Sequence, residues 1–150
     1  MKYLWNVVSL IDSVMTEHKL KHLELIQGVV NRLASNSFQL KGWCVTLVTG
    51  ILFFGSTMAG EKRHLLMIAL IPVLIFWMLD GYFLWQERLF RRTYDIVRQK
   101  PEAGIDFKMF EKGDKRLYWI KAVFSLTLIA FYIGLISAIV LLRVCVFSSS

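Results

Sequence analysis

The stretch LLMIALIPVLIFWMLDGYFLWQ, residues 65–86, decides the fold of this chain. Its first fifteen residues are uncharged, and with Tyr82 and Trp85 it reaches the roughly 20 residues that a helix needs to cross a ~30 Å hydrocarbon layer. The charged segment that follows, residues 87–98, keeps helical spacing. We therefore expect one long helix that leaves a membrane and continues into water, with a bend at Pro72.

Two further apolar runs accompany this helix. Residues 42–60 and 122–142 contain nineteen and twenty-one uncharged residues, and hydrophobic residues make up 56% of the 150-residue chain. A soluble domain of this length does not gather its apolar residues in uninterrupted runs. The expected fold class is an all-α integral membrane protein with three transmembrane helices, an N-terminal amphipathic helix and a long second helix that extends into the cytoplasm. Residues 61–64 leave room only for a tight antiparallel hairpin.

The charges predict how the chain is divided and oriented. We expect an amphipathic cytoplasmic helical region in residues 1–40, a transmembrane hairpin with its cytoplasmic extension in residues 41–99, and an amphipathic linker with the third transmembrane helix in residues 100–150. Of the 18 Lys and Arg residues, fifteen lie in the N-terminal segment and residues 87–121. The positive-inside rule places both in the cytoplasm and the C-terminus outside. The basic loop is either this topology signal alone or a contact for lipid headgroups, a nucleotide or RNA.

The N-terminal region carries two amphipathic stretches. Residues 1–15 are too short to span and predict a helix at the membrane interface or against a partner. Residues 18–33 carry a stripe typical of helix contacts within one chain or between subunits. Its members are Leu23, Ile26, Val30 and Leu33. His18 and His22 are interpreted as part of the opposite, solvated face, because no third ligand accompanies them. The small polar residues 34–37 predict a helix end, an N-cap or a hinge.

Asp80 is the ionisable residue inside the second apolar run. A charge at that depth costs about 2.5 to 3.5 kcal/mol on insertion scales, so it faces a partner, a cavity or another subunit, unless it lies shallow enough to be wetted. Both interpretations stay open. Small and hydroxyl residues in the first run allow close helix approach. The candidate positions for a polar path or a subunit contact in the membrane are Asp80, Thr46, Thr49 and Ser56.

The segment after the membrane exit predicts an ion-paired helix. Glu87 and Arg91, and Arg91 and Asp95, are each four residues apart. This surface is either simply solvated or a docking site for a soluble partner. The candidate contacts for a neighbouring subunit or partner are Leu23, Ile26, Val30, Leu33, Glu87, Arg88, Arg91 and Arg92. Residues 105–110 predict a short amphipathic element on the membrane surface, and Tyr118 and Trp119 would anchor the third helix at the interface.

The chain carries no recognisable catalytic motif. P-loop, GxGxxG, HExxH, GxSxG and CxxC patterns are missing, and the acidic residues do not pair in a way that suggests acid–base catalysis. Cys44 and Cys145 lie in apolar surroundings and are interpreted as packing residues. We therefore expect no enzyme activity, no cofactor and no metal site.

Two segments together resemble a known group of proteins: HLELIQGVVNRLASNSFQLKGW, residues 22–43, and LDGYFLWQERLFRRTYDIV, residues 79–97. These segments belong to an expected order of an N-terminal helix, a hairpin and a charged helix with a QER motif. This order resembles the SLATT group of bacterial proteins, the SMODS- and SLOG-associating two-transmembrane effectors. It is also similar to small membrane subunits of some CRISPR and RADAR defence operons. The third apolar run departs from the two-span pattern.

The resemblance implies a homo-oligomer of the bacterial inner membrane that acts in antiphage defence. Such an effector would perturb or permeabilise the membrane when a soluble sensor signals infection. Three helices cannot enclose a channel, so any pore would need several subunits. Two other functions stay open. The chain could be a non-conducting anchor that recruits a soluble partner through its basic loop, or a small ion-coupled transporter in which Asp80 titrates.

Overall fold

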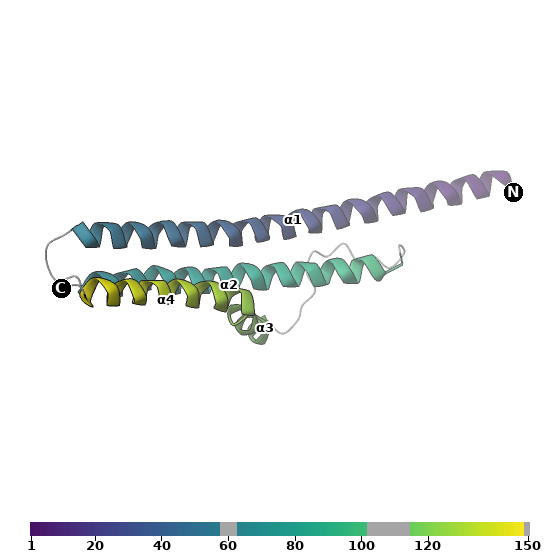
Figure 1. Cartoon of the computed structure of the whole chain (residues 1–150). Coiled ribbons are helices and arrows are strands. Elements are labelled where there is room, and N and C mark those ends of the chain that lie inside the picture. Colours follow the sequence, from purple (N-terminus) through teal and green to yellow (C-terminus); the bar gives the residue numbers. More distant parts are fainter. Residues whose placement is uncertain (58–62, 102–114, 149–150) are drawn as a thin grey trace. The chain divides into compact units, whose positions relative to one another are not determined.

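The computed structural model describes residues 1–57, 63–101 and 115–148, and this part of the chain is entirely helical apart from short connections. It contains four helices (Figure 1), with the following bounds: α1 (Lys2–Thr57), α2 (Arg63–Gln99), α3 (Lys115–Val123) and α4 (Leu126–Ser148). The predicted all-α class is confirmed for these residues.

The helices group into two compact units. Unit 1 comprises Met1–Leu33 and Gln86–Gly113, and unit 2 comprises Ala34–Trp85 and Asp114–Ser150. Each unit therefore combines segments that are far apart in the sequence. The same two helices, α1 and α2, supply residues to both units.

The N-terminal region is one helix, not two amphipathic stretches followed by a separate span. α1 runs without interruption for 56 residues, so the helix end or hinge that was predicted at residues 34–37 is wrong. Relative to alanine, serine or asparagine in a helix interior lowers helix stability by only about 0.7 kcal/mol or less. Proline, by contrast, removes a backbone hydrogen bond outright. The side chain of Ser37 is used in a tertiary contact with Asp80 instead of a cap.

The second helix follows the sequence expectation closely. α2 is a single helix of 37 residues with Pro72 inside it, and it joins the apolar run to the charged segment. It ends at Gln99, where the amide of Lys100 still donates to the carbonyl of Ile96 at 3.1 Å, and Pro101 follows. A proline disfavours helical geometry in the residue before it, which explains the stop.

The third apolar run is broken near its start, which corrects the expected continuous helix over residues 122–142. α3 ends at Val123 and α4 begins at Leu126, so Phe124 and Ser125 separate two helices. In Figure 1, α3 turns away from the line of α4. Ser125 precedes the first residue of α4, a preferred position for serine at a helix start. The helix also continues to Ser148, beyond the expected end at residue 142.

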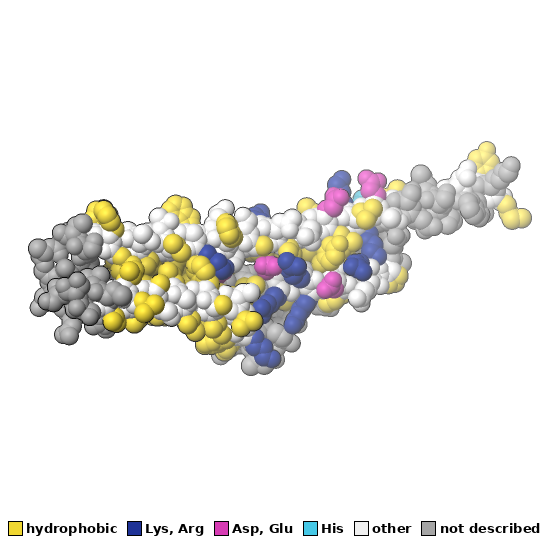
Figure 2. Space-filling view, in the orientation of Figure 1, with side chains coloured by type: hydrophobic (Ala, Val, Ile, Leu, Met, Phe, Trp, Pro, Cys, Tyr) yellow, Lys and Arg dark blue, Asp and Glu magenta, His cyan; other side chains and the backbone are white. Residues whose placement is uncertain are grey.

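Unit 2 has a small core to which three helices contribute. Side chains from α1, α2 and α4 form it: Cys44, Val48, Val73, Leu128, Tyr132 and Ile139. Many other large apolar side chains of the unit are exposed, and the face in Figure 2 shows some of them. Phe53 is 63% exposed and Leu126 is 83% exposed. Such a surface is unfavourable in water and favourable in hydrocarbon.

Two of the helices are long and apolar enough to cross a membrane. The candidate spans are Thr16–Phe54 on α1 and Ile68–Gln99 on α2, while the apolar part of α4, Leu126–Leu142, is shorter. These lengths support a membrane location for the chain. The apolar part of α4 is too short to be counted as a third candidate span by the same criterion.

Unit 1 buries one stripe of α1 and one stripe of α2. Ile26 and Val30 are almost fully buried, as are Thr93 and Val97 on the other helix. His22 is only 6% exposed. The solvated position that was expected for it is therefore wrong, because it precedes Ile26 by one helical turn and shares its face.

Several expectations concern residues outside the described part of the chain. These are the turn at residues 61–62 and the amphipathic element at residues 105–110. Arg63 and His64, which were assigned to the same turn, lie in the first turn of α2. The side chains of Ser56 and Cys145 are also outside the described set.

Candidate functional site

The central polar site of unit 2 is built around Asp80 on α2, whose side chain is completely buried. The ammonium of Lys41 lies 2.6 Å from carboxylate Oδ2, and the hydroxyl of Ser37 donates to Oδ1. The phenol of Tyr132 on α4 donates to Oδ2 over 3.3 Å. Three helices of unit 2 therefore meet at one carboxylate. We call Ser37, Lys41, Asp80 and Tyr132 the Asp80 cluster.

Helical spacing brings Ser37 and Lys41 to the same face of α1. They are four residues apart, and the Lys41 ammonium lies 3.0 Å from the Ser37 hydroxyl and 3.4 Å from its carbonyl oxygen. It also lies 5.9 Å from the centre of the Phe131 ring, within the range of a cation–π contact. Charge, hydroxyl and ring thus surround the ammonium, while a quarter of the Lys41 side chain remains exposed.

Aromatic stacking holds Tyr132 in place. Its ring stacks on Trp77 of α2 with centroids 5.7 Å apart and planes 10° from parallel. The Trp77 indole in turn donates a hydrogen bond of 3.0 Å to the carbonyl oxygen of Val123, the last residue of α3. This carbonyl belongs to a helix end, where backbone acceptors lack partners within the helix. The contact ties the break between α3 and α4 to α2.

A close approach of backbones supports the same region. A Cβ atom on Gly81 would lie 2.4 Å from Cγ2 and 3.1 Å from Cα of Val123, so only glycine fits there without movement. Small residues at helix contacts are typical of membrane proteins. Gly81 next to Asp80 therefore fixes the distance between α2 and the end of α3.

The Asp80 cluster is a charge-compensated packing site. A carboxylate buried in apolar surroundings is tolerated when it is paired and hydrogen-bonded. Both oxygens of Asp80 have polar partners, and a cation lies against one of them. Among the described residues, no group of three or more His, Cys, Asp or Glu side chains could hold a metal ion.

No family model, curated protein or solved structure matches this chain. The chemical interpretation of the Asp80 cluster therefore depends on its own contacts.

Two of the other expected membrane positions, Thr46 and Thr49, do not join this cluster. Thr46 and Thr49 are exposed on α1, and the hydroxyl of Thr46 donates within its own helix, to the carbonyl of Gly42 at 3.0 Å. Ser37, Lys41 and Tyr132 were not predicted as site residues. Two sequence signals could have indicated the Lys41–Asp80 pair. One is the spacing of four residues between Ser37 and Lys41, and the other is the single acidic residue in an apolar run.

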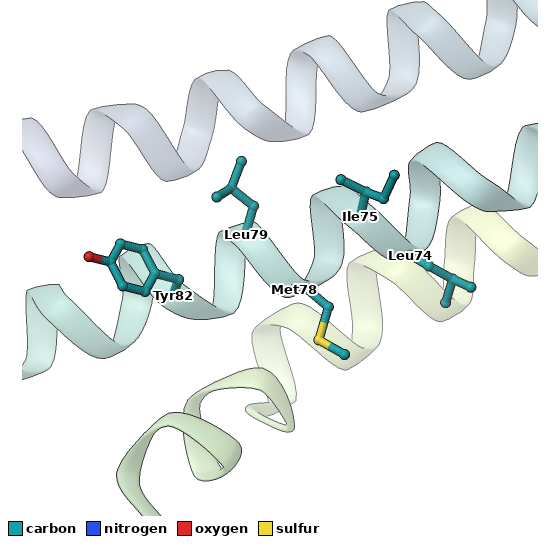
Figure 3. A pocket seen from close by; sticks show the side chains of 5 residues that line it. All are labelled: Leu74, Ile75, Met78, Leu79 and Tyr82. Carbon is teal, nitrogen blue, oxygen red and sulfur yellow. The ribbon is translucent and has the colours of Figure 1, made fainter. Parts of the chain in front are cut away.

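A shallow apolar hollow lies on a different face of α2. Its five lining side chains all come from this helix, as Figure 3 shows: Leu74, Ile75, Met78, Leu79 and Tyr82. Each is at least 41% exposed. With no charged side chain in its lining, this face is suited to contact with hydrocarbon.

In unit 1 the described polar contacts are structural. Arg91 places Nε and Nη2 each 2.8 Å from the same carboxylate oxygen of Glu87, so the predicted pair forms, and the guanidinium is directed to Glu87 and not to Asp95. The ammonium of Lys19 donates to the carbonyl oxygen of Lys100 at 2.8 Å, just beyond the end of α2. A cation there is favourable next to the helix C-terminus.

The predicted contact residues of unit 1 divide by burial. Ile26 and Val30 are used inside the unit, and Leu23 and Leu33 are half-buried. The arginines at 88, 91 and 92 are exposed. The apolar stripe thus serves contacts within this chain, while the basic residues remain accessible to a partner.

Proposed function

We propose that this chain is an oligomeric protein of the bacterial inner membrane that acts in antiphage defence and perturbs or permeabilises the membrane when a soluble sensor signals. The observation that carries the membrane part is the inverted polarity of unit 2. Its charged carboxylate is fully buried while Phe53, Phe54 and Leu126 are more than 60% exposed. The defence context depends on the resemblance of residues 22–43 and 79–97 to SLATT-type effectors.

In this proposal α4 is the third transmembrane helix. Its 23 residues correspond to about 34 Å of helix, comparable to a ~30 Å hydrocarbon core. The distribution of Lys and Arg places the N-terminus and the segment before α3 in the cytoplasm and the C-terminus outside.

Permeabilisation would occur between copies of the chain. Asp80 is neutralised by Lys41 of the same chain, so it is engaged in packing and is not a free charge along a path. A channel enclosed by several subunits is the remaining geometry for a chain with three spans. We therefore assign Asp80 to holding each subunit together, in place of the pore-lining role considered from the sequence.

The test is the mass of the purified protein in lipid nanodiscs, measured by native mass spectrometry at two protein concentrations. A discrete oligomer at both concentrations, together with ion leakage from vesicles that contain the protein, is expected. A monomer at both concentrations would refute the effector mechanism, because one subunit encloses no path.

A second function is favoured by the accessible arginines of unit 1. An anchoring subunit would use Arg88, Arg91 and Arg92 to recruit an acidic soluble partner and would conduct nothing. Reversing these charges to Glu discriminates between the two functions. An anchor loses its partner, whereas an autonomous pore keeps its leakage rate. Charge reversal at the exposed Lys21 and Arg32 is the matched control.

A further inference from the structure

The short helix α3 is set off from α4 by contacts, and this gives it a separate role. The break at Phe124 and Ser125 is fixed by the hydrogen bond from the Trp77 indole to the Val123 carbonyl and by the close approach of Val123 to Gly81. After the break, the amide of Ile129 donates to the carbonyl of Ser125 at 2.9 Å and starts the new helix. The change of direction is therefore part of the packed structure of unit 2.

The two sides of α3 differ in exposure. Ala122 and Val123 are buried, at 0% and 6% exposure. Ile120 is 49% exposed, Phe124 is 62% exposed, and the charged Lys121 is exposed as well. One side of this short helix therefore packs on the protein, and the other presents apolar side chains beside a lysine.

This combination is suited to the boundary between hydrocarbon and water. Apolar and aromatic side chains enter the acyl boundary, while lysine extends its ammonium to the headgroups. Only four residues lie between Lys121 and Leu126, the strongly exposed first residue of the apolar helix α4. The sequence adds Lys115 and Arg116 in the first turn of α3 and an aromatic residue, Trp119, of the kind found at membrane interfaces.

We propose that α3 lies in the headgroup layer and binds anionic phospholipid headgroups through Lys121. The proposal rests on the membrane location proposed above. Phosphate oxygens complement the Lys121 ammonium, and the exposed apolar side chains of Ile120 and Phe124 require hydrocarbon nearby, which a soluble polyanion does not provide.

The position of α3 can be measured with spin labels in nanodiscs that contain phosphatidylcholine and phosphatidylglycerol. In a Cys44→Ala, Cys145→Ala background, single cysteines at 120, 124 and 133 carry the label, and accessibility to oxygen and to a water-soluble nickel chelate gives the depth. We expect the label at 133, on α4, in the hydrocarbon and the labels at 120 and 124 at headgroup depth.

The headgroup contact is tested by native mass spectrometry of retained phosphatidylglycerol. Lys121→Gln is expected to lower the apparent affinity about fivefold, the contribution of one basic residue near an anionic surface. Lys121→Arg should preserve it, and Lys21→Gln, at an exposed site on α1, is the control.

The outcomes separate the two proposals. A label at 120 in open water or at the bilayer centre, with the label at 133 in hydrocarbon, would overturn the role of α3 and leave the membrane location intact. Equal phosphatidylglycerol retention in Lys121→Gln and the parent would overturn the headgroup contact. A label at 133 in water would overturn the membrane location and, with it, this inference.

Discussion

Replacing Lys41 with methionine is expected to destabilise unit 2 strongly, because it removes the ammonium 2.6 Å from a carboxylate with 0% exposure. Removing one partner of a buried ion pair costs roughly 3 to 5 kcal/mol. The hydroxyls of Ser37 and Tyr132 still donate to Asp80 in the variant, which favours the lower end of this range. About 3 kcal/mol corresponds to a shift of roughly a hundredfold in the unfolding equilibrium constant.

The opposite replacement is expected to cost less. In Asp80→Asn the amide oxygen can still accept from one hydroxyl, and the amide NH2 can donate to the oxygen of the other. Lys41, whose side chain is 25% exposed, can turn its ammonium toward a more polar environment. The carboxylate left by Lys41→Met has no such route. We therefore predict that Lys41→Met is the more destabilising variant of the pair, and that the double variant Lys41→Met, Asp80→Leu recovers most of the loss.

The measurement is equilibrium unfolding in mixed micelles of dodecyl maltoside and sodium dodecyl sulfate, followed by tryptophan fluorescence. Thr46→Val, at an exposed site on α1, is the control and should stay near the parent value. Two results would refute the reasoning. One is equal stability of Lys41→Met and Asp80→Asn, and the other is a coupling energy between the two sites within about 0.5 kcal/mol of zero.

Three further predictions follow from contacts in the two units. Tyr132→Phe should lower the unfolding free energy by about 1 to 2 kcal/mol, because the hydrogen bond to Asp80 disappears while the ring still stacks on Trp77. An unchanged unfolding midpoint in the mixed-micelle assay would contradict this. Gly81→Ala should cost roughly 1 to 3 kcal/mol through its clash with Val123, and Val123→Ala should partly restore stability in the double variant. Ile26→Ala should lower the unfolding free energy by about 2 to 5 kcal/mol, measured by thermal unfolding, because Ile26 is fully buried. Leu25→Ala is the control and should cost little, because Leu25 is 58% exposed. Equal effects of the two variants would show that the stripe of α1 that contains Ile26 is not buried.

Much of the helical content could be predicted from periodicity. The long helix through residues 65–98 follows from an apolar run joined to a segment with charges four residues apart, and its stop follows from Pro101. The Glu87–Arg91 pair follows from the same spacing. Local spacing decides these features, because the interacting groups belong to one helix.

Local reasoning failed where a distant contact outweighed a weak local preference. Residues 34–37 have the composition of a helix end, yet their small cost to a helix is easily offset by packing, and Ser37 is bound to Asp80. Residues 122–142 have the composition of one continuous helix, yet the chain breaks where Trp77 binds the carbonyl of Val123. His22 was assigned to the wrong face for a similar reason, since its burial depends on tertiary packing and not on the sequence of α1 alone.

The amino-acid sequence by itself determined that this chain is helical, that its apolar residues gather in long runs, and that Asp80 needs a partner or water. It determined these things because hydropathy and helical spacing are properties of neighbouring residues. Only the tertiary structure decided that the partner is Lys41, with Ser37 and Tyr132 completing the Asp80 cluster. Such a choice depends on which side chains three packed helices bring within hydrogen-bonding distance, and the identity of those neighbours is not contained in any single stretch of the chain.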